Sequence, residues 1–351
     1  MIMRILYVNN INEVAKMYGN GLTERNHTVT LYEPSLAGGL APLPIKLAMM
    51  PGRILNMRYT AGQLNLSHFD IAHINWASYG VLGLVSRVPF IVHCHGTDVR
   101  DRLKYPLFHS MLSTIFQRAA AVMCITPDLV PTIQTMRSDV IFFPAPIDTE
   151  HFVPEEDYQR HLSQPWTILL FARLDPIKGV DIAAQGIARF VQRHSDVRVC
   201  LLDWGPLREQ YKQWYGERFE FVPLVAPNEV VRLIRSADVI VGQFALGALG
   251  LSELQAMSCA KPVITSFIYE DAYSNPPPLC QATTAEEIDQ HLENLFRHPE
   301  VGATLGRNAR EWIIGNHDYR VLSAKLETLY QTIVGLSEAS NLLPAGLNQL
   351  F

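Results

Sequence analysis

The sequence predicts an α/β protein built from two doubly wound domains. Short apolar runs alternate with helical segments, and this alternation breaks near residue 150 and then restarts. The length of 351 residues is also about that of two ordinary domains. Strands that alternate with helices favour parallel sheets with helices on both faces, so each half of the chain is expected to form such a sheet.

The front half provides the first cycle of elements. Its first apolar run is followed by a helical segment at 11–25. Turn or helix signals bound every later run, which favours short buried strands. The expected strands are residues 3–9, 27–34, 70–76, 89–96, 121–126 and 140–144.

The second cycle begins after residue 165, and the last third of the chain is helical. Strands are expected at 166–173, 197–204, 219–223, 238–244 and 262–266. Helices are expected at 178–194, 205–215, 227–237, 251–259, 285–297, 301–316 and 319–336.

Residues 145–165 are proline-rich, charged and weakly periodic, which indicates a domain boundary. We therefore expect an N-terminal domain over 1–150, a C-terminal domain over 151–318, and a C-terminal helix with a tail over 319–351. Ligands of doubly wound domains bind where the carboxyl ends of strands meet helix N-termini. We expect the ligand in a central cleft that the two domains face.

Composition narrows the class of protein. A content of 48% hydrophobic and 18% charged residues is typical of a globular chain, and a net charge of −5 counts against a nucleic-acid binder. The five cysteines form no CxxC pair, so neither a disulfide framework nor structural zinc is expected. The first residues do not resemble a signal peptide, and no apolar stretch is long enough to span a membrane. We expect a cytoplasmic protein.

The sequence FARLDPIKGVD at 171–181 predicts an anion site. Arg173 ends a strand, and Lys178 follows five residues later at the start of a helix. A planar guanidinium and a mobile ammonium suit a diphosphate, and a cation at a helix N-terminus is unfavourable unless an anion is bound there. The competing interpretation is two solvated surface charges.

Residues 242–265 read as strand, glycine-rich loop, helix and strand. Gly247 and Gly250 would let backbone N–H groups approach a ligand at the start of the helix. Glu253 and Gln255 lie early in that helix, where an acidic side chain could accept hydrogen bonds from ribose hydroxyls. The competing interpretation is that Glu253 only complements the helix dipole.

The sequence IVHCHGTDVR at 91–100 places His95 at the carboxyl end of a strand, with Asp98 just after it. Such a pair could do acid–base work, whereas a zinc site lacks a third ligand nearby. Residues 40–58 mix apolar side chains with three cations. They favour an ordinary packed helix over a membrane-lying or lipid-cradling one.

Together these segments resemble glycosyltransferase family 4, whose members have the two-domain GT-B fold with Rossmann-like domains. The resemblance is collinear over roughly residues 3–336. It is carried by HGTD (95–98), PAPIDTEHFVP (144–154), FARLDPIKGVD (171–181), WGPLREQ (204–210), LGLSELQAMSCAKPVI (249–264) and LGRNAREWI…LETLYQTI (305–333).

The resemblance implies roles for particular residues. Arg173 and Lys178 would bind the donor diphosphate, and His95 would lie beside the donor sugar. The final helix, 319–336, would cross back to the N-terminal domain. Candidate catalytic residues are thus His95, Arg173 and Lys178; donor-binding candidates add Gly205, Gly247, Leu249, Gly250, Leu251, Glu253 and Gln255; acceptor-side candidates are Asn9, Asn10 and Asp98.

The sequence departs from the family in three places. The family's Glu-x7-Glu pair falls on Gly247 and Gln255, so a ribose contact would need the amide of Gln255 or a shifted Glu253. Only Gly205 remains of a G-x-G turn at 203–205. Asn9 and Asn10 begin the segment that replaces the glycine-rich loop after the first strand.

We therefore expect a retaining, metal-independent glycosyltransferase with a UDP- or GDP-linked sugar donor as co-substrate and no other cofactor. The expected acceptor is a glycan, a lipid or a small molecule. A peripheral membrane contact would use the N-terminal domain at the inner membrane face. Two alternatives stay open: a nucleotide-sugar epimerase or phosphorylase on the same fold, and a non-catalytic nucleotide-sugar-binding subunit.

Overall fold

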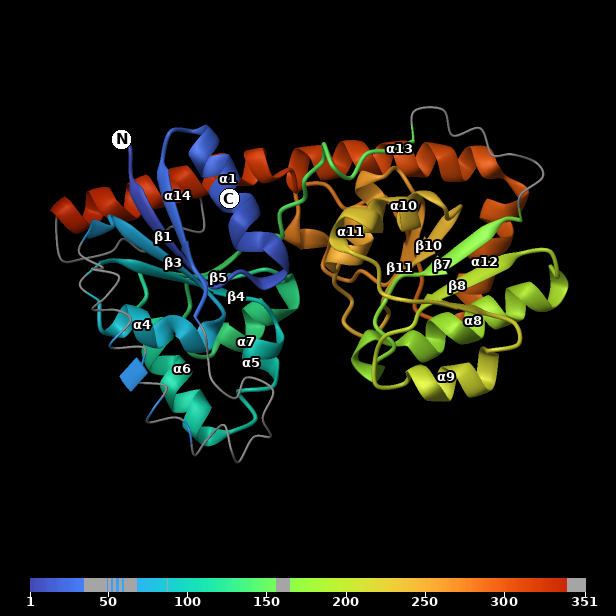
Figure 1. The fold of residues 1–351 in the computed structure, drawn as a ribbon, viewed down its shortest axis with the longest axis horizontal. Helices are drawn as coiled ribbons and strands as arrows, with labels where there is room; N and C mark the ends of the chain where they lie inside the picture. The colour runs from blue at the N-terminus through green and yellow to red at the C-terminus, as the bar shows by residue number, and fades with distance from the viewer. Residues whose placement is uncertain are drawn as a thin grey trace. The chain divides into compact units, whose positions relative to one another are not determined.

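The computed structural model describes residues 1–34, 68–86, 88–155 and 165–339, with isolated positions at 49, 52, 55, 56 and 59. The predicted helix at 40–58 and most of the boundary segment after residue 155 lie outside these residues. The described chain divides into two compact units (Figure 1). Unit 1 is Met1–Pro146 together with the chain from Tyr319 onward, and unit 2 is Ile147–Asp318.

Among the described residues, six parallel strands form the sheet of unit 1, in the order β2-β1-β3-β4-β5-β6. They are β1 (Arg4–Val8), β2 (Thr28–Tyr32), β3 (Ile71–Asn75), β4 (Phe90–Cys94), β5 (Ala121–Cys124) and β6 (Val140–Phe142). Its helices are α1 (Val14–Glu24), α4 (Val81–Leu84), α5 (Thr97–Arg100), α6 (Pro106–Arg118), α7 (Val130–Gln134) and α14 (Tyr319–Ala339).

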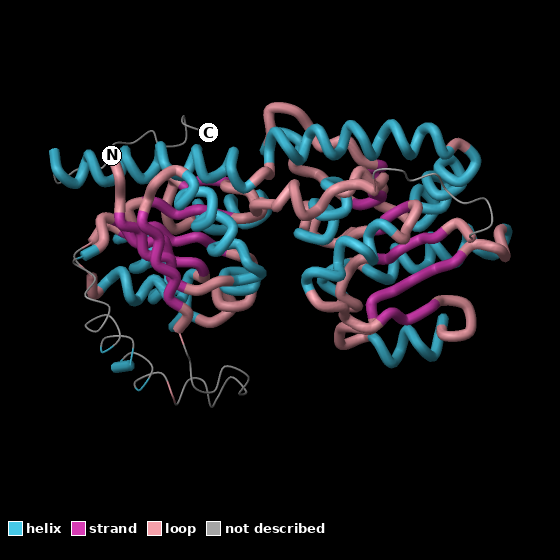
Figure 2. Tube along the Cα trace, turned by 45° about the horizontal axis from the view of Figure 1, so that its top comes forward, coloured by secondary structure: helices cyan, strands magenta, loops and turns pink. Residues whose placement is uncertain are grey.

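Helices cover both faces of this sheet (Figure 2). Alternate residues of a strand point to opposite faces, so Ile5 and Tyr7 pack in one apolar cluster and Leu6 and Val8 in another. The first cluster contains residues of α1 and α14, and the second contains residues of α6 and α7.

The C-terminal helix α14 belongs to unit 1, although more than 170 residues of unit 2 precede it. Its buried residues recur at helical spacing and join the same cluster as α1: Leu322, Leu326, Leu329, Tyr330, Ile333 and Val334. A Cβ on Gly21 of α1 would lie 2.4 Å from the Ser323 hydroxyl, so a residue without a side chain lets the two helices approach.

Unit 2 repeats the architecture with the strand order β12-β11-β10-β7-β8-β9, again parallel in the described chain. The strands are β7 (Thr167–Leu170), β8 (Arg198–Leu202), β9 (Glu220–Val222), β10 (Val239–Val241), β11 (Val263–Thr265) and β12 (Cys280–Gln281). The helices are α8 (Val180–Arg193), α9 (Arg208–Tyr215), α10 (Val230–Arg235), α11 (Leu251–Ser258), α12 (Ala285–Arg297) and α13 (Pro299–Asn316).

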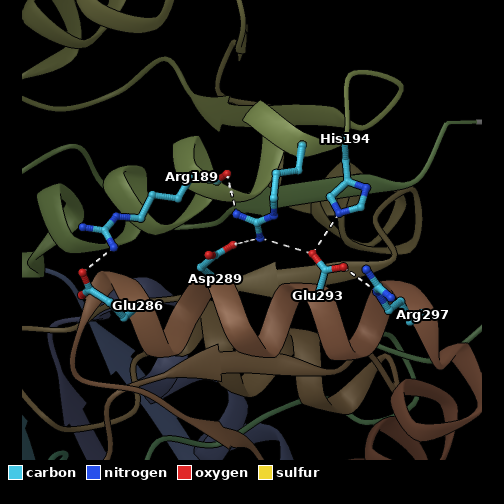
Figure 3. Close-up of polar contacts among 7 residues, drawn as sticks. Arg189, His194, Glu286, Asp289, Glu293 and Arg297 are labelled. Carbon is cyan, nitrogen blue, oxygen red and sulfur yellow. Dashed lines mark hydrogen bonds and ion pairs between the residues drawn. The ribbon is translucent and has the colours of Figure 1, made fainter.

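Helices α8 and α12 pack together and share a polar rim (Figure 3). Arg193 donates to Asp289 at 2.6 Å and to Glu293 at 3.2 Å, and His194 lies 2.9 Å from the same Glu293 carboxylate. Arg297 is the third donor to Glu293, at 2.5 Å. These donors lower the pKa of Glu293 to about 2, with the His194 hydrogen bond the largest cause.

The predicted order of strands and helices is confirmed, and the fold class is the predicted α/β with two doubly wound units. The strands are two to four residues shorter than predicted, because the terminal residues of each apolar run leave the ladder for a loop. The two-residue strand β12 was not predicted, since so short a strand has no measurable period.

Candidate functional site

The carboxyl edge of the unit 2 sheet carries the predicted cations. Arg173 follows β7 and lies half-buried, with its Nη2 donating to Asp175 at 2.5 Å. The guanidinium carbon lies 5.6 Å from the centre of the Trp204 ring, a cation–π contact. Its buried Nε has no hydrogen-bond partner among the described residues. Asp175 also caps the turn at 176–178, so the pair fixes the loop that carries Arg173.

Lys178 is tied to the loop after β10. Its Nζ donates to Gln243 Oε1 at 2.7 Å, and Gln243 Nε2 donates in turn to the carbonyl of Ala248 at 2.6 Å. Gly179 has φ 64°, and a Cβ there would lie 2.7 Å from the Ala245 nitrogen. Gly179 therefore lets the loops after β7 and β10 approach each other.

Glu253 is not available to a ribose, and this part of the prediction is wrong. The side chain is 2% exposed, and its carboxylate accepts from the backbone N–H groups of Gln243 at 2.8 Å and Gly250 at 3.0 Å. Its bond to the Gly250 N–H caps the start of α11. Burial raises the pKa of Glu253, and the Lys178 charge opposes that shift. The helix-capping interpretation therefore holds.

The other predicted donor-side residues lie on the same loops. Gly247 has φ 61°, which favours glycine, and Gly250 begins α11. Leu249 is 5% exposed, so its backbone is the part a ligand can meet. Leu251 and Gln255 are half-buried on α11.

Gly205 is needed for packing between two loops. Its φ is 129°, and a Cβ would lie 2.3 Å from the carbonyl oxygen of Leu174. The Leu174 N–H donates to the Trp204 carbonyl at 2.8 Å, which joins the loops after β7 and β8. This joining places Trp204, 45% exposed, against Arg173. Sequence reasoning missed Trp204 and Gln243, although both stand at strand ends where ligands of such sheets bind.

The carboxyl edge of the unit 1 sheet carries His95, just after β4. Its Nε2 lies 3.0 Å from Oδ1 of Asn75, the last residue of β3. Asn9, with φ 70°, donates from its side chain to the Asn75 carbonyl at 3.2 Å. The structure thus brings Asn9 and His95 to one residue, Asn75, that the sequence analysis did not single out.

Asp98 holds the His95 loop and does not pair with the imidazole, contrary to the predicted His/Asp pair. It is 0% exposed, and its carboxylate accepts from the backbone N–H groups of Ala77 at 2.8 Å, His95 at 2.9 Å and Gly96 at 2.7 Å. Burial raises the pKa of Asp98 to about 6. With its oxygens buried on the backbone, Asp98 does not present a surface to an acceptor, so its predicted acceptor-side place is corrected.

Asn10 is a helix-start residue in the structure. Its side-chain N–H donates to Glu13 at 3.0 Å, and its oxygen accepts from the backbone N–H of Lys16 at 3.2 Å. Asn10 and Asn9 both remain half-buried. Of the two, Asn9 lies nearer the polar groups around His95.

A series of four buried hydrogen bonds lies beneath His95. In each of them only one of the two groups can be the donor. His93 Nε2 lies 3.2 Å from the carbonyl of Phe143, which only accepts, so His93 is the donor. His73 Nε2 must then donate to His93 Nδ1 at 3.2 Å, and the Tyr330 hydroxyl to His73 Nδ1 at 2.5 Å. The Tyr7 hydroxyl completes the chain by donating to Tyr330 at 2.8 Å.

The four side chains joined by these hydrogen bonds are buried and uncharged. Tyr7, His73, His93 and Tyr330 are each 0% exposed. Burial lowers the pKa of His93 to about 4, and burial also lowers the pKa of His73 well below its ordinary value. Burial also raises the pKa of both tyrosines. Every member is uncharged near neutral pH, and α14 is hydrogen-bonded to the middle of the sheet through Tyr330.

Two general features complete the description of the sites. In the parts of the chain that the structure describes, no group of three or more His, Cys, Asp or Glu side chains could hold a metal ion. Nor is any helix in the same parts both long and apolar enough to cross a membrane.

Two parallel α/β units, each with polar groups at the carboxyl edge of its sheet, define a GT-B protein. Solved structures share this fold. Sucrose-phosphate synthase from Thermosynechococcus elongatus aligns with a TM-score of 0.73 at 16% identity, over 96% of this chain and 100% of that one. Anabaena HepE, solved with UDP and glucose, aligns with a TM-score of 0.68 at 15% identity, over 93% and 99%.

Family models match both units. The model described as Glycosyltransferase Family 4 matches residues 11–151, and that described as Glycosyl transferases group 1 matches 165–297. The chain is thus a GT-B member of the glycosyltransferase group, resembling family 4. A GDP-mannose-dependent α-(1-6)-phosphatidylinositol monomannoside mannosyltransferase of Mycolicibacterium smegmatis is 21% identical over 214 residues, which are 53% of this chain and 54% of that protein. The chain spans about half the length of the curated relatives it matches.

Proposed function

We propose that this chain transfers a sugar from a nucleotide-sugar donor to a glycan, lipid or small-molecule acceptor. The observation that carries the proposal is the pair of cations, Arg173 and Lys178, on the loop after β7 at the carboxyl edge of the unit 2 sheet. A donor of this kind contains a diphosphate, and the collinear family resemblance gives that diphosphate to these two residues.

The geometry of the unit 2 edge supports diphosphate binding. Arg173 keeps a buried Nε without a protein partner among the described residues, so the guanidinium has donor capacity left beyond Asp175. Gln243 aims the Lys178 ammonium, and the loop at 247–250 leads into the N-terminus of α11. Backbone N–H groups and the positive end of a helix dipole add to the attraction for an anion.

These groups would act on the leaving group. Cleavage of the sugar–phosphate bond leaves growing negative charge on the diphosphate, and fixed donors that strengthen their interaction as charge grows lower the barrier. Retention of configuration, hexosyl transfer and independence of metal are proposed from the family resemblance. The donor base is proposed to be uracil or guanine, because HepE is described with UDP and the mycobacterial relative is named for GDP-mannose.

The acceptor is proposed to meet the unit 1 edge near Asn9, whose side chain donates to the Asn75 carbonyl. A cytoplasmic location with peripheral contact at the inner membrane face fits a lipid-linked acceptor. The mycobacterial relative is named for a phosphatidylinositol monomannoside. That lipid is therefore the first acceptor to test.

A donor screen and a transfer assay test the proposal. The full chain is incubated with UDP- and GDP-sugars, with and without the lipid acceptor and with and without Mg²⁺, and product is followed by mass spectrometry. We expect sugar transfer to acceptor with one base, at a similar rate in EDTA. Failure of every donor to bind or react would overturn the proposal, whereas isomerised donor without acceptor would favour an epimerase.

A second candidate is a donor-binding subunit without catalysis. It is favoured by the segment 247–255, where Gly247 on the loop and Gln255 on α11 stand at the positions of the family's carboxylates and Glu253 caps the helix. Its signature would be nucleotide-sugar binding without turnover of any donor, alone or with acceptor. The same assay separates the two candidates, because binding and product are measured on the same sample.

A further inference from the structure

The side chain of Asn75 forms a hydrogen bond with the imidazole ring of His95. Asn75 is 0% exposed, and its Oδ1 lies 3.0 Å from His95 Nε2. An amide oxygen has no proton to give, so the imidazole must donate its Nε2–H. A neutral imidazole has one N–H, and Nδ1 is then left with a lone pair.

Among the residues that the structure describes, no other neighbour forms a hydrogen bond with the His95 ring. The His93 ring is the nearest aromatic, with its centre 5.2 Å from that of His95, but both His93 nitrogens are engaged with His73 and Phe143. Asp98 binds the backbone N–H of His95 and not its ring. Across the described residues, Asn75 is the one recorded hydrogen-bond partner of the His95 imidazole.

The charges around His95 favour its neutral form. Buried neutral His93 lies beside it on β4 and buried neutral His73 on β3. From α5, Asp98 directs its carboxylate to three backbone amides, and the Arg100 guanidinium is paired with Asp128 at 2.5 Å. Burial, together with His93, lowers the pKa of His95 well below its ordinary value.

We propose that Asn75 is a positioning residue that holds His95 as the neutral Nε2–H tautomer, so that Nδ1 accepts a hydrogen bond from a carbohydrate hydroxyl. A lone pair at Nδ1 attracts a hydroxyl donor and repels a phosphate oxygen. His95 would therefore bind a hydroxyl of the sugar and not a phosphate. The identity of the ligand rests on the proposed function; the tautomer does not.

The tautomer is tested without any substrate. The full chain is labelled with ¹⁵N-histidine, the His95 signals are assigned with His95→Gln, and two-bond ¹H–¹⁵N spectra distinguish protonated from unprotonated ring nitrogens. We expect a protonated Nε2 and an unprotonated Nδ1 at pH 7. A protonated Nδ1, or an averaged signal from both tautomers, would overturn the proposal.

The role of Asn75 is tested by Asn75→Asp, which replaces the amide oxygen by a carboxylate. A carboxylate at this distance raises a histidine pKa by about 1–3 units, so His95 should titrate at higher pH than in the wild type. Asn26→Asp adds the same charge at an exposed site of unit 1 and should leave that titration unchanged. An unshifted His95 in folded Asn75→Asp would contradict the proposal.

Asn75→Ala is the alternative variant if the buried carboxylate of Asn75→Asp prevents folding. It removes the acceptor and adds no charge, so the tautomer of His95 should become mixed. A pure Nε2–H tautomer in this variant would show that Asn75 does not set it. If wild type binds no sugar nucleotide yet shows the expected tautomer, the proposed function fails and the assignment of Asn75 stands.

If transfer is measurable, the pH profile adds a functional readout. In the wild type, His95 stays neutral down to pH values below its ordinary range, so the apparent KM for donor should be flat from pH 8 to 6. In Asn75→Asp the imidazolium form should raise the KM for donor as pH falls over this range. Parallel profiles for the two proteins would overturn the hydroxyl-accepting role.

Discussion

The carboxyl edges of the two sheets differ in the charge of the side chains that form them. At the edge of unit 1, a half-buried histidine rests on buried, neutral imidazoles and phenols whose protons have one allowed arrangement. At the edge of unit 2, two half-buried cations, Arg173 and Lys178, donate hydrogen bonds to Asp175 and Gln243. The comparison teaches that unit 1 provides fixed hydrogen-bond geometry without charge. Unit 2 provides positive charge, and among the described residues the buried Arg173 Nε has no hydrogen-bond partner.

The largest expected difference between the two units is the loss of folding stability at acidic pH. His93 has a pKa of about 4 in the folded chain, whereas the unfolded chain takes up that proton near pH 6.5. The stabilisation is therefore present above pH 6.5 and is lost as pH falls toward 4, by up to about 3 kcal/mol. In unit 2, Glu293 with a pKa of about 2 loses its contribution only below pH 4.5.

Urea unfolding at pH 7, 6, 5 and 4.5 measures this difference, with Trp76 as the probe of unit 1 and the tryptophans of unit 2 replaced by phenylalanine. Asp98, whose pKa of about 6 is raised, acts in the opposite direction and offsets part of the loss. His93→Gln should remove the part of the pH-dependent loss of stability that is due to His93. Equal acid sensitivity of His93→Gln and wild type would contradict the neutral-chain account.

Tyr330→Phe should destabilise unit 1 by about 1–3 kcal/mol, because it leaves the Tyr7 hydroxyl and His73 Nδ1 without their buried partners. The midpoint of urea unfolding measures the change. Tyr32→Phe, which removes a half-buried tyrosine hydroxyl elsewhere in unit 1, is the matched control. An unchanged midpoint in Tyr330→Phe would mean that the hydroxyl chain does not stabilise the fold.

Lys178→Met should weaken binding of a nucleoside diphosphate about tenfold, since a charge-assisted contact contributes roughly 1.5–3 kcal/mol. The corresponding monophosphate should lose less. Titration of UDP, UMP, GDP and GMP by calorimetry checks both statements. Equal losses of affinity for the monophosphate and the diphosphate would mean that Lys178 does not contact the terminal phosphate.

The smallest effect is expected at the rim of α8 and α12. Glu293→Gln removes a carboxylate that three cationic or imidazole donors share, yet surface ion pairs contribute about 0–1 kcal/mol. Thermal unfolding should show a shift of a few degrees at most, reduced by salt. A large, salt-independent loss would show that this network carries a buried charge, contrary to its 23% exposed carboxylate.

Local patterns were enough to predict the fold and the strand ends that carry the candidate site residues. Period and turn residues located the helices and nearly all the strands, and strand ends located His95, Arg173 and Lys178. Glu253 was misjudged because a carboxylate at the third helical position suits both a ribose and a cap on the helix N-terminus. Only the path of the backbone, which brings Gln243 and Gly250 to that carboxylate, decides between them.

The partners of His95 were beyond sequence reasoning for a different reason. Asn75 precedes His95 by 20 positions, and the two meet because β3 pairs directly with β4. Tyr330 is 257 positions from His73, and they meet because α14 packs on the first sheet after the chain has completed unit 2. Neither spacing follows a helix or strand period, so no pattern in the chain marks these pairs.

The central claim is that the cations of unit 2 bind a nucleoside diphosphate. The most direct test is calorimetric titration of UDP and GDP into the wild type, Arg173→Ala and the control Arg232→Ala, whose side chain is exposed on α10. The account predicts binding of one base to wild type and to the control, and at least tenfold weaker binding to Arg173→Ala. Equal affinity in all three proteins, or no binding by wild type, would contradict it.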